Sequence, residues 1–179
     1  MKTLTLLRHA KSGWDDTVAR DFDRPVNPRG RRAARTVGRE MKALGLSFDA
    51  VLASPARRVM ETLEEVASAF GPLRPRFDER IYLAGADTLL QIVQEADEGA
   101  ERLLLVGHNP GLEMLALKLT RGADRLRGEV EIKYPTATLA EITLEVERWS
   151  DVRDGTGILA RFIRPRDLDP ELGPDDDSY

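Results

Sequence analysis

Short apolar runs that alternate with longer amphipathic segments constrain the fold of this chain more than any other feature. The runs at 3–7, 50–54 and 102–107 are rich in Leu, Val and Ala, which is typical of strands buried on both faces of a sheet. A segment with helical periodicity follows each run. Because strand–helix alternation favours parallel strands with helices on both sides, the sequence predicts an α/β fold, a three-layer α/β/α sandwich with a mostly parallel central sheet.

Four amphipathic segments predict the helices of the outer layers. Their apolar stripes are formed by Ala33, Val37, Met41 and Leu44, by Val59, Leu63, Val66 and Phe70, by Leu89, Leu90 and Val93, and by Leu112, Leu115 and Leu119. Gly45 and Gly71 follow the first two stripes, at the position where glycine commonly ends a helix.

Three of the predicted helices share one starting device. Asn27, Ser54 and Asn109 each stand directly before a proline. An Asn or Ser side chain can accept a hydrogen bond from a free N–H of the first turn, and proline is favoured at the first helical position. The sequence therefore predicts helices that begin at the three prolines.

The pattern changes after about residue 135. Residues 137–146 alternate between apolar and polar side chains, as in a strand with one buried face, and residues 157–163 resemble a partner for it. These two segments predict an antiparallel edge to the sheet. We expect a single domain over 1–166, followed by an acidic, flexible C-terminal tail over 167–179.

Composition limits the possible function. The chain has no cysteine, and it lacks the histidine and carboxylate spacings of common metal motifs, so we expect no metal site and no cofactor. It shows no signal peptide and no apolar run near the ~20 residues of a membrane helix. The net charge of −4 argues against nucleic acid, and the basic run at 29–35 is interpreted as a solvated helix face. We expect a cytoplasmic monomer that binds neither nucleic acid nor membrane.

Both histidines of the chain follow predicted strands. Arg8 and His9 end the first strand, Arg57 and Arg58 come just after the second, and His108 follows the third. In parallel sheets the ligand binds beyond the carboxyl ends of the strands. Helix N-termini at that edge add free N–H donors and partial positive charge. This group of side chains predicts a site for a phosphoryl group.

Five segments carry a resemblance to a known family. They read LLRHAKS, DFDRPVNPRG, LASPARRVMETLEEV, ERIYLAG and LLLVGHNPGLE, and they run in family order from residue 4 to about 115. In these segments the chain resembles the SixA-type phosphohistidine phosphatases of the histidine phosphatase superfamily. Members of that superfamily share the fold of the cofactor-dependent phosphoglycerate mutases.

The resemblance implies a role for each residue at the strand ends. His9 would be the nucleophile that carries the phosphoryl group until water removes it. Arg8, Arg58 and a protonated His108 would clamp the phosphoryl oxygens in the transition state. Thr62 follows Arg58 by four residues, as the family motif requires, so Arg57 is predicted to face outward.

Four further residues and one segment lie near these positions in the sequence pattern. Asn109 would supply a backbone donor to the phosphate, and Ser12 would supply a hydroxyl. Glu79 lies where the mutases place a proton donor, although a charged residue in such a segment is equally often a solvated surface group. The segment 21–27 could line the site, although a segment rich in Asp, Pro and Asn is usually a turn before a helix. Trp14 could contact substrate at the rim, although a lone aromatic side chain more often covers an edge of the core.

The sequence thus predicts a metal-independent phosphatase that works through a phosphohistidine enzyme intermediate. Its predicted substrate is phosphohistidine on a protein, such as a phosphotransfer domain or a phosphotransferase-system protein. One alternative is a phosphatase for small phosphomonoesters, which would depend on Glu79 as a proton donor. A second alternative is a phosphate-binding module without catalysis, although such a module would have no use for His9 as a nucleophile.

Overall fold

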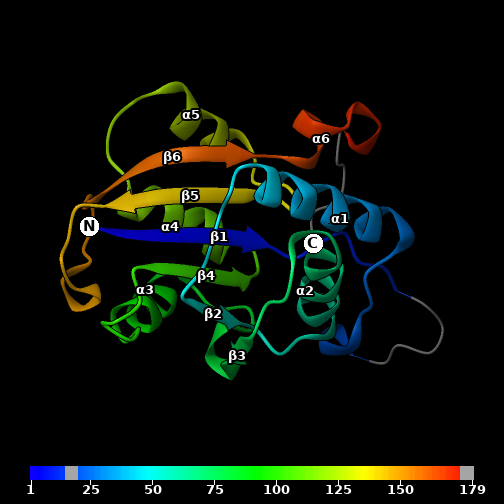
Figure 1. Cartoon of the computed structure of the whole chain (residues 1–179), viewed down its shortest axis with the longest axis horizontal. Coiled ribbons are helices and arrows are strands. Elements are labelled where there is room, and N and C mark those ends of the chain that lie inside the picture. Colours follow the sequence, from blue (N-terminus) through cyan, green and yellow to red (C-terminus); the bar gives the residue numbers. More distant parts are fainter. Residues whose placement is uncertain (15–19, 174–179) are drawn as a thin grey trace.

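A single mixed sheet runs through the molecule, as the sequence predicts. The computed structural model describes residues 1–14 and 20–173, and its strands lie in the order β3-β2-β4-β1-β5-β6 (Figure 1). The strands are β1 (Lys2–Arg8), β2 (Ala50–Ala53), β3 (Pro75–Phe77), β4 (Arg102–Gly107), β5 (Leu139–Leu144) and β6 (Gly157–Ile163). Strands β1 to β4 are mutually parallel, and β5 runs antiparallel to both neighbours. The mostly parallel sheet with an antiparallel edge is confirmed.

Helices cover both faces of the sheet. They are α1 (Pro28–Ala43), α2 (Arg57–Phe70), α3 (Ala86–Gln94), α4 (Gly111–Leu119), α5 (Arg125–Ile132) and α6 (Pro165–Leu168). One apolar cluster joins the sheet to α3, α4 and α5, and a second joins it to α1 and α2 (Figure 1). Successive β4 residues alternate between the clusters, since Leu103 and Leu105 belong to the first and Leu104 and Val106 to the second. This alternation confirms the three layers.

The start of α1 follows the prediction, whereas two other helix starts differ from it. Asn27 accepts a hydrogen bond from the Gly30 amide, 2.8 Å away, and Pro28 is the first helical residue. Helix α2 begins only at Arg57, because the Ser54 hydroxyl is engaged in a turn with the Ala56 amide and in a bond to a histidine of the neighbouring strand end.

Helix α4 also begins one residue later than predicted. Gly111 is its first residue, and Pro110 precedes the helix. The Asn109 side chain still serves the first turn, because its oxygen accepts from the Glu113 amide, while its NH₂ group donates to the carbonyl of Tyr134. The capping chemistry predicted for Asn109 is therefore present with a shifted helix boundary.

Three elements were not predicted from the sequence: strand β3, helix α5 and the four-residue helix α6. Strand β3 has three residues, begins with proline and has no buried side chain, so it lacks an apolar pattern. Helix α5 buries only Val130 among its eight residues, so its apolar stripe is too narrow to be recognised. These two elements depend on their neighbours, because β3 pairs with the edge of β2 and α5 lies against α4 and β6.

The segment predicted as the start of a flexible tail is packed in its first half. Residues 170–172 form a 3-10 turn, and the Leu172 side chain is buried in the cluster under α1. Arg32 of α1 forms ion pairs with Asp169 and Glu171. The apolar contact of Leu172 and the two ion pairs of Arg32 thus hold this part of the acidic segment against α1. The proposed domain boundary after residue 166 falls within α6. Residues 174–179 lie outside the described part of the chain.

Within residues 1–14 and 20–173, no helix combines the length and the apolar character of a transmembrane span.

A glycine sets the distance between α1 and α2. A Cβ atom on Gly38 would lie 2.6 Å from the backbone oxygen of Val66 in α2, closer than a carbon and an oxygen can approach. Helix α5 offers a contrast, because a Cβ on Gly128 would meet nothing within 4 Å. Replacing Gly38 with alanine introduces a close contact, whereas replacing Gly128 with alanine changes only the helix propensity. Comparing the two variants therefore distinguishes these two effects on stability.

We expect Gly38→Ala to lower the free energy of unfolding by about 1–3 kcal/mol, the usual cost of overpacking. Gly128→Ala should instead raise it by about 0.5–1 kcal/mol, since alanine is the better helix former. Urea unfolding of both variants measures the difference. A Gly38→Ala variant as stable as the wild type would show that α1 and α2 separate without cost.

Candidate active site

The carboxyl ends of β1, β2 and β4 meet at one edge of the sheet and hold the predicted site residues. His9 follows β1, and its amide donates to the carbonyl of Gly107 at the end of β4. The Ser54 amide, just after β2, donates to the carbonyl of Val106. The backbone ladder therefore continues past the strands and brings His9, Ser54 and His108 to neighbouring positions.

The two imidazole rings lie together and are almost fully buried. Their centroids are 5.4 Å apart, and each side chain is at most 3% exposed. Nδ1 of His9 lies 2.8 Å from the carbonyl oxygen of Ala10. Because a carbonyl oxygen only accepts, Nδ1 carries the proton, and Nε2 retains the lone pair that a nucleophile needs.

The hydrogen bonds of His108 define the opposite tautomer. The guanidinium of Arg58 can only donate, and its Nη2 lies 3.4 Å from Nδ1 of His108. Nδ1 is therefore the acceptor, and Nε2 donates to the Ser54 hydroxyl at 2.8 Å. This arrangement explains why Ser54 is buried at the strand end instead of capping α2.

Burial and neighbouring cations keep both histidines neutral near pH 7. Desolvation lowers the pKa of His9 well below 6.5, and the charge of Arg8 adds to this effect. Burial and then the charge of Arg58 lower the pKa of His108 to about 3. The expectation of a protonated His108 thus differs from this structure. An oxyanion beside the ring would favour the charged form and raise this pKa.

Arg58 is buried and held by Asp21. Its Nη1 donates to the Asp21 carbonyl at 2.8 Å, and its Nη2 donates to the Asp21 carboxylate at 3.0 Å. The Nε atom is buried and has no hydrogen-bond partner within the described part of the chain, so it remains a donor for a ligand. Arg57 instead points outward and pairs with Glu61, as predicted.

Asp21 is the centre of a polar network at the mouth of the pocket. Its carboxylate also accepts from the Tyr82 hydroxyl at 2.5 Å and from Nε of Arg24 at 2.9 Å. Partial burial acts to raise the pKa of Asp21, but the Tyr82 hydrogen bond and the charge of Arg58 outweigh it and hold this pKa below its usual range. Asp21 is therefore a carboxylate at neutral pH.

A pocket of about 180 Å³ opens above these side chains. It is lined by His9, Asp21, Arg24, Arg58, Leu83, His108 and Asn109. Arg8 is buried beside His9, and its Nη1 donates to the carbonyl of Tyr134 at 2.8 Å. A nucleophilic nitrogen thus stands among guanidinium groups, which is an arrangement suited to in-line attack on phosphorus.

Three other sequence candidates lie outside the pocket lining. Glu79 begins the 3-10 turn Glu79–Ile81, and its side chain is exposed. The Ser12 hydroxyl accepts a hydrogen bond from Arg24 at 2.9 Å, so it contacts the pocket through that arginine. Trp14 is 61% exposed, with the Arg24 guanidinium 5.2 Å from its ring centroid.

Sequence reasoning missed three residues of the pocket: Asp21, Arg24 and Leu83. The segment containing Asp21 and Arg24 was interpreted as a turn, although opposite charges three residues apart, next to a proline, were a visible signal. Leu83 gave no signal in the sequence. Its backbone has a φ of 51°, a left-handed conformation that is uncommon for a leucine, and its side chain is exposed at the pocket.

Among the described residues, no group of three or more His, Asp or Glu side chains is placed to hold a metal ion.

Known proteins are similar to this chain in sequence and in fold. The family model described as histidine phosphatase superfamily (branch 1) matches residues 4–82. The Mycobacterium tuberculosis (strain H37Rv) protein named Uncharacterized protein Rv1276c is 35% identical over 163 residues, which cover 89% of this chain and all of that protein. Phosphohistidine phosphatase SixA of Escherichia coli is 26% identical over 143 residues, which cover 78% of this chain and 84% of that protein.

A solved structure agrees with these relatives. A protein of Nakamurella multipartitia assigned as a phosphohistidine phosphatase SixA superposes with a TM-score of 0.79 and 26% identity, over 92% of this chain and 96% of that chain. Together with the paired histidines among arginines at the carboxyl edge of the sheet, these matches identify a phosphatase. This chain belongs to the histidine phosphatase superfamily.

Two adjacent arginines offer a matched test of the pocket. Arg58→Ala should lower kcat/KM about 10²–10³-fold, the usual effect of losing a buried donor to the transition state. Arg57→Ala should change it less than about threefold, since Arg57 contacts Glu61 at the surface. Circular dichroism must show both variants folded. Equal losses in the two variants would contradict the register of α2.

The low pKa of His108 predicts that this side chain takes up a proton when an anion binds in the pocket. Because an anion raises a pKa that stands at about 3, sulfate should bind more tightly as the pH falls from 8 to 5, at most about tenfold per pH unit. Sulfate itself does not titrate in this range. Calorimetry in two buffers of different ionisation enthalpy measures the proton uptake, and His108→Gln should reduce it. A sulfate affinity independent of pH would show that His108 takes up no proton when the anion binds.

Proposed function

We propose that this phosphatase removes the phosphoryl group from phosphohistidine on a protein, through a phosphorylated His9. Alkoxide leaving groups need a proton donor at the oxygen that departs. A phosphohistidine whose second ring nitrogen is protonated instead expels a neutral imidazole, whose conjugate acid has a pKa near 6.5, so its departure needs no acid from the enzyme. A pocket that contains a proton donor is therefore suited to phosphomonoesters, and a pocket without one is suited to phosphohistidine.

The single observation that carries the proposal is the state of the pocket's carboxyl group. Asp21 is the one carboxylate among the described residues that line the pocket, and its low pKa leaves it without a proton to donate. Glu79, the donor that a phosphomonoesterase would need, is exposed and lies outside that lining. The pocket is thus better equipped for a P–N bond than for a P–O bond.

The proposed reaction has two displacements at phosphorus. In the first, Nε2 of His9 forms a bond to phosphorus as the bond to the substrate ring nitrogen breaks; that nitrogen keeps the electron pair, and the second ring nitrogen of the substrate keeps the proton it took from solvent, so a neutral imidazole departs. In the second, water attacks the phosphorylated His9, releases inorganic phosphate and returns the neutral imidazole. Arg58 and Arg8 stabilise the charge on the phosphoryl oxygens in both steps, and His108 joins them once the anion has raised its pKa.

The likeness to SixA of E. coli, whose name states a phosphohistidine phosphatase, supports this choice of substrate. The pocket is open and small, so a phosphorylated side chain that projects from a protein surface can reach Nε2 of His9. The partner we propose is accordingly a protein that carries phosphohistidine, and not a nucleic acid.

Purified enzyme should hydrolyse a phosphohistidine protein and phosphoramidate at least about 10²-fold faster, in kcat/KM, than the alkyl phosphate phosphoserine, because general acid catalysis is worth about 10²–10⁴-fold when an alkoxide departs. EDTA should leave these rates unchanged. His9→Ala should abolish turnover, and ³²P should become attached to wild-type protein in an acid-labile form but not to His9→Ala.

Two results would overturn the proposal. Faster hydrolysis of phosphomonoesters, with a large loss in Glu79→Gln, would identify a phosphomonoesterase whose donor moves into the pocket. Binding of phosphate without turnover of any substrate in the panel would identify a binding module.

A further inference from the structure

A second hollow lies at the same edge of the sheet as His9. It is lined by four cationic side chains, Lys11, Arg29, Arg164 and Arg166, and by no carboxylate of residues 1–14 and 20–173. Its floor is apolar and includes Ala33 and Leu172. Like charges gathered over an apolar surface repel one another, and an anion placed among them removes that repulsion.

Ion pairs neutralise most of the neighbouring arginines, whereas two arginines of this hollow have no ion pair within the described residues. In the basic run of α1, Arg31 and Arg35 pair with glutamates of α2, and Arg32 pairs with the C-terminal segment. Within the described residues Arg29 and Arg166 form no ion pair, and both are exposed. Arg164 is partly neutralised by Asp167. The unneutralised positive charge therefore concentrates at the hollow.

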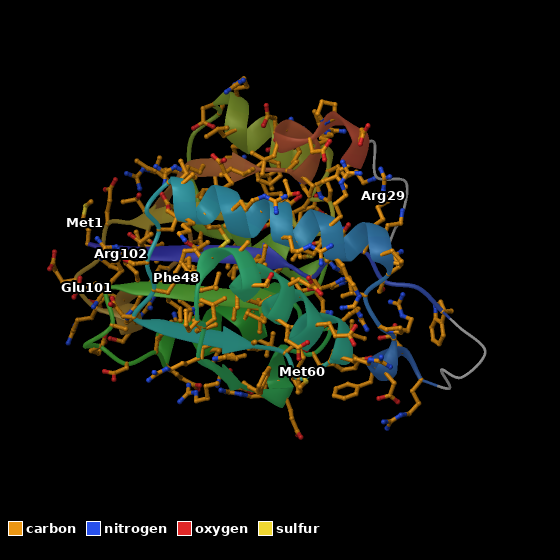
Figure 2. All side chains as sticks on the ribbon, turned by 45° about the vertical axis from the view of Figure 1, so that its right-hand side comes forward. Met1, Arg29, Phe48, Met60, Glu101 and Arg102 are labelled. Carbon is orange, nitrogen blue, oxygen red and sulfur yellow. The ribbon has the colours of Figure 1, made fainter. Side chains whose placement is uncertain are left out.

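The sheet register gives the backbone separation between the strand ends next to the hollow and next to the catalytic pocket. Leu7 of β1 pairs with Leu139 of β5, which pairs with Ile163 of β6, so Arg164 follows β6 two strands away from His9. Two strand spacings amount to about 10 Å. Figure 2 shows Arg29 at the N-terminal end of α1, on the opposite side of the molecule from Met1. In Figure 1, β1 points toward the same side as this end of α1.

The size of the hollow indicates what it can hold. About 20 Å³ is accessible within it, which is room for one small group and not for a base or a sugar. A distance of about 10 Å corresponds to about three residues of extended peptide. A side chain that carries a single carboxylate, three residues from a phosphohistidine, would reach the hollow while the phosphoryl group reaches His9.

We infer that the hollow formed by Lys11, Arg29, Arg164 and Arg166 is a docking site for an acidic side chain of the phosphorylated partner protein. This inference rests on the proposed function. The hollow would select substrates by the residues that surround phosphohistidine, whereas the catalytic pocket would bind the phosphorylated residue itself. Charges at the rim of an interface act mainly on the rate of association, so the effect should appear in kcat/KM and should weaken in high salt.

The test uses two synthetic peptides that carry one phosphohistidine, with Glu or with Gln three residues to either side. Wild-type enzyme should have a kcat/KM about tenfold higher for the Glu peptide, and Arg29→Glu/Arg166→Glu should remove that preference. The double variant should hydrolyse the Gln peptide and phosphoramidate at the wild-type rate. Arg39→Glu, an exposed arginine near the other end of α1, should retain the preference.

The outcomes separate this inference from the proposed function. Equal rates for the two peptides in wild-type enzyme would overturn the inference and leave the proposed function standing. The same conclusion follows if the double variant loses activity on both peptides alike, or if it loses only the binding of inorganic phosphate measured by calorimetry. Failure of wild-type enzyme to hydrolyse either peptide would overturn the proposed function and this inference with it.

Discussion

Arg58 carries a full positive charge into a place where only 2% of its side chain meets solvent. An ion removed from water costs on the order of several kcal/mol in a protein unless charges and hydrogen bonds compensate for it. Here Asp21 supplies both a carbonyl and a carboxylate to the guanidinium, and Tyr82 and Arg24 hold that carboxylate in turn. Burial is the main cause of the low pKa of His108, and the charge of the same arginine adds to it, so this buried ion helps to keep the ring neutral.

Local patterns in the sequence were sufficient for most of the framework and for the residues at the strand ends. The strands at 102–107 and 157–163 lie where the apolar runs predict them, and Asn27 begins α1 as expected. The positions of His9 and Arg58 at the carboxyl edge follow from such patterns alone, because topology brings parallel strand ends together. Elements without an apolar pattern, β3 and α5, could not be found in this way.

The contacts that adjust the site were not predictable, because each joins residues far apart in the chain. Asp21 lies 37 positions from Arg58, and Ser54 lies 54 positions from His108. In the sequence, each of these residues has a common local explanation, a turn for Asp21 and a helix cap for Ser54. Only the contact with a distant residue shows which explanation is right. The Ser54 hydroxyl, which was expected to cap α2, accepts a hydrogen bond from His108 instead.

Asp21 also determines how the pocket can use Arg58. A guanidinium that is already held in position spends no free energy on ordering when the phosphoryl group arrives, and such preorganised charge contributes more to the transition state than a mobile one. The carboxylate beside it repels a phosphate ion as well, which weakens the binding of substrate and of inorganic phosphate alike. Because only interactions that are stronger in the transition state accelerate the reaction, a pocket with fixed donors and weak affinity for phosphate favours turnover over retention of the product.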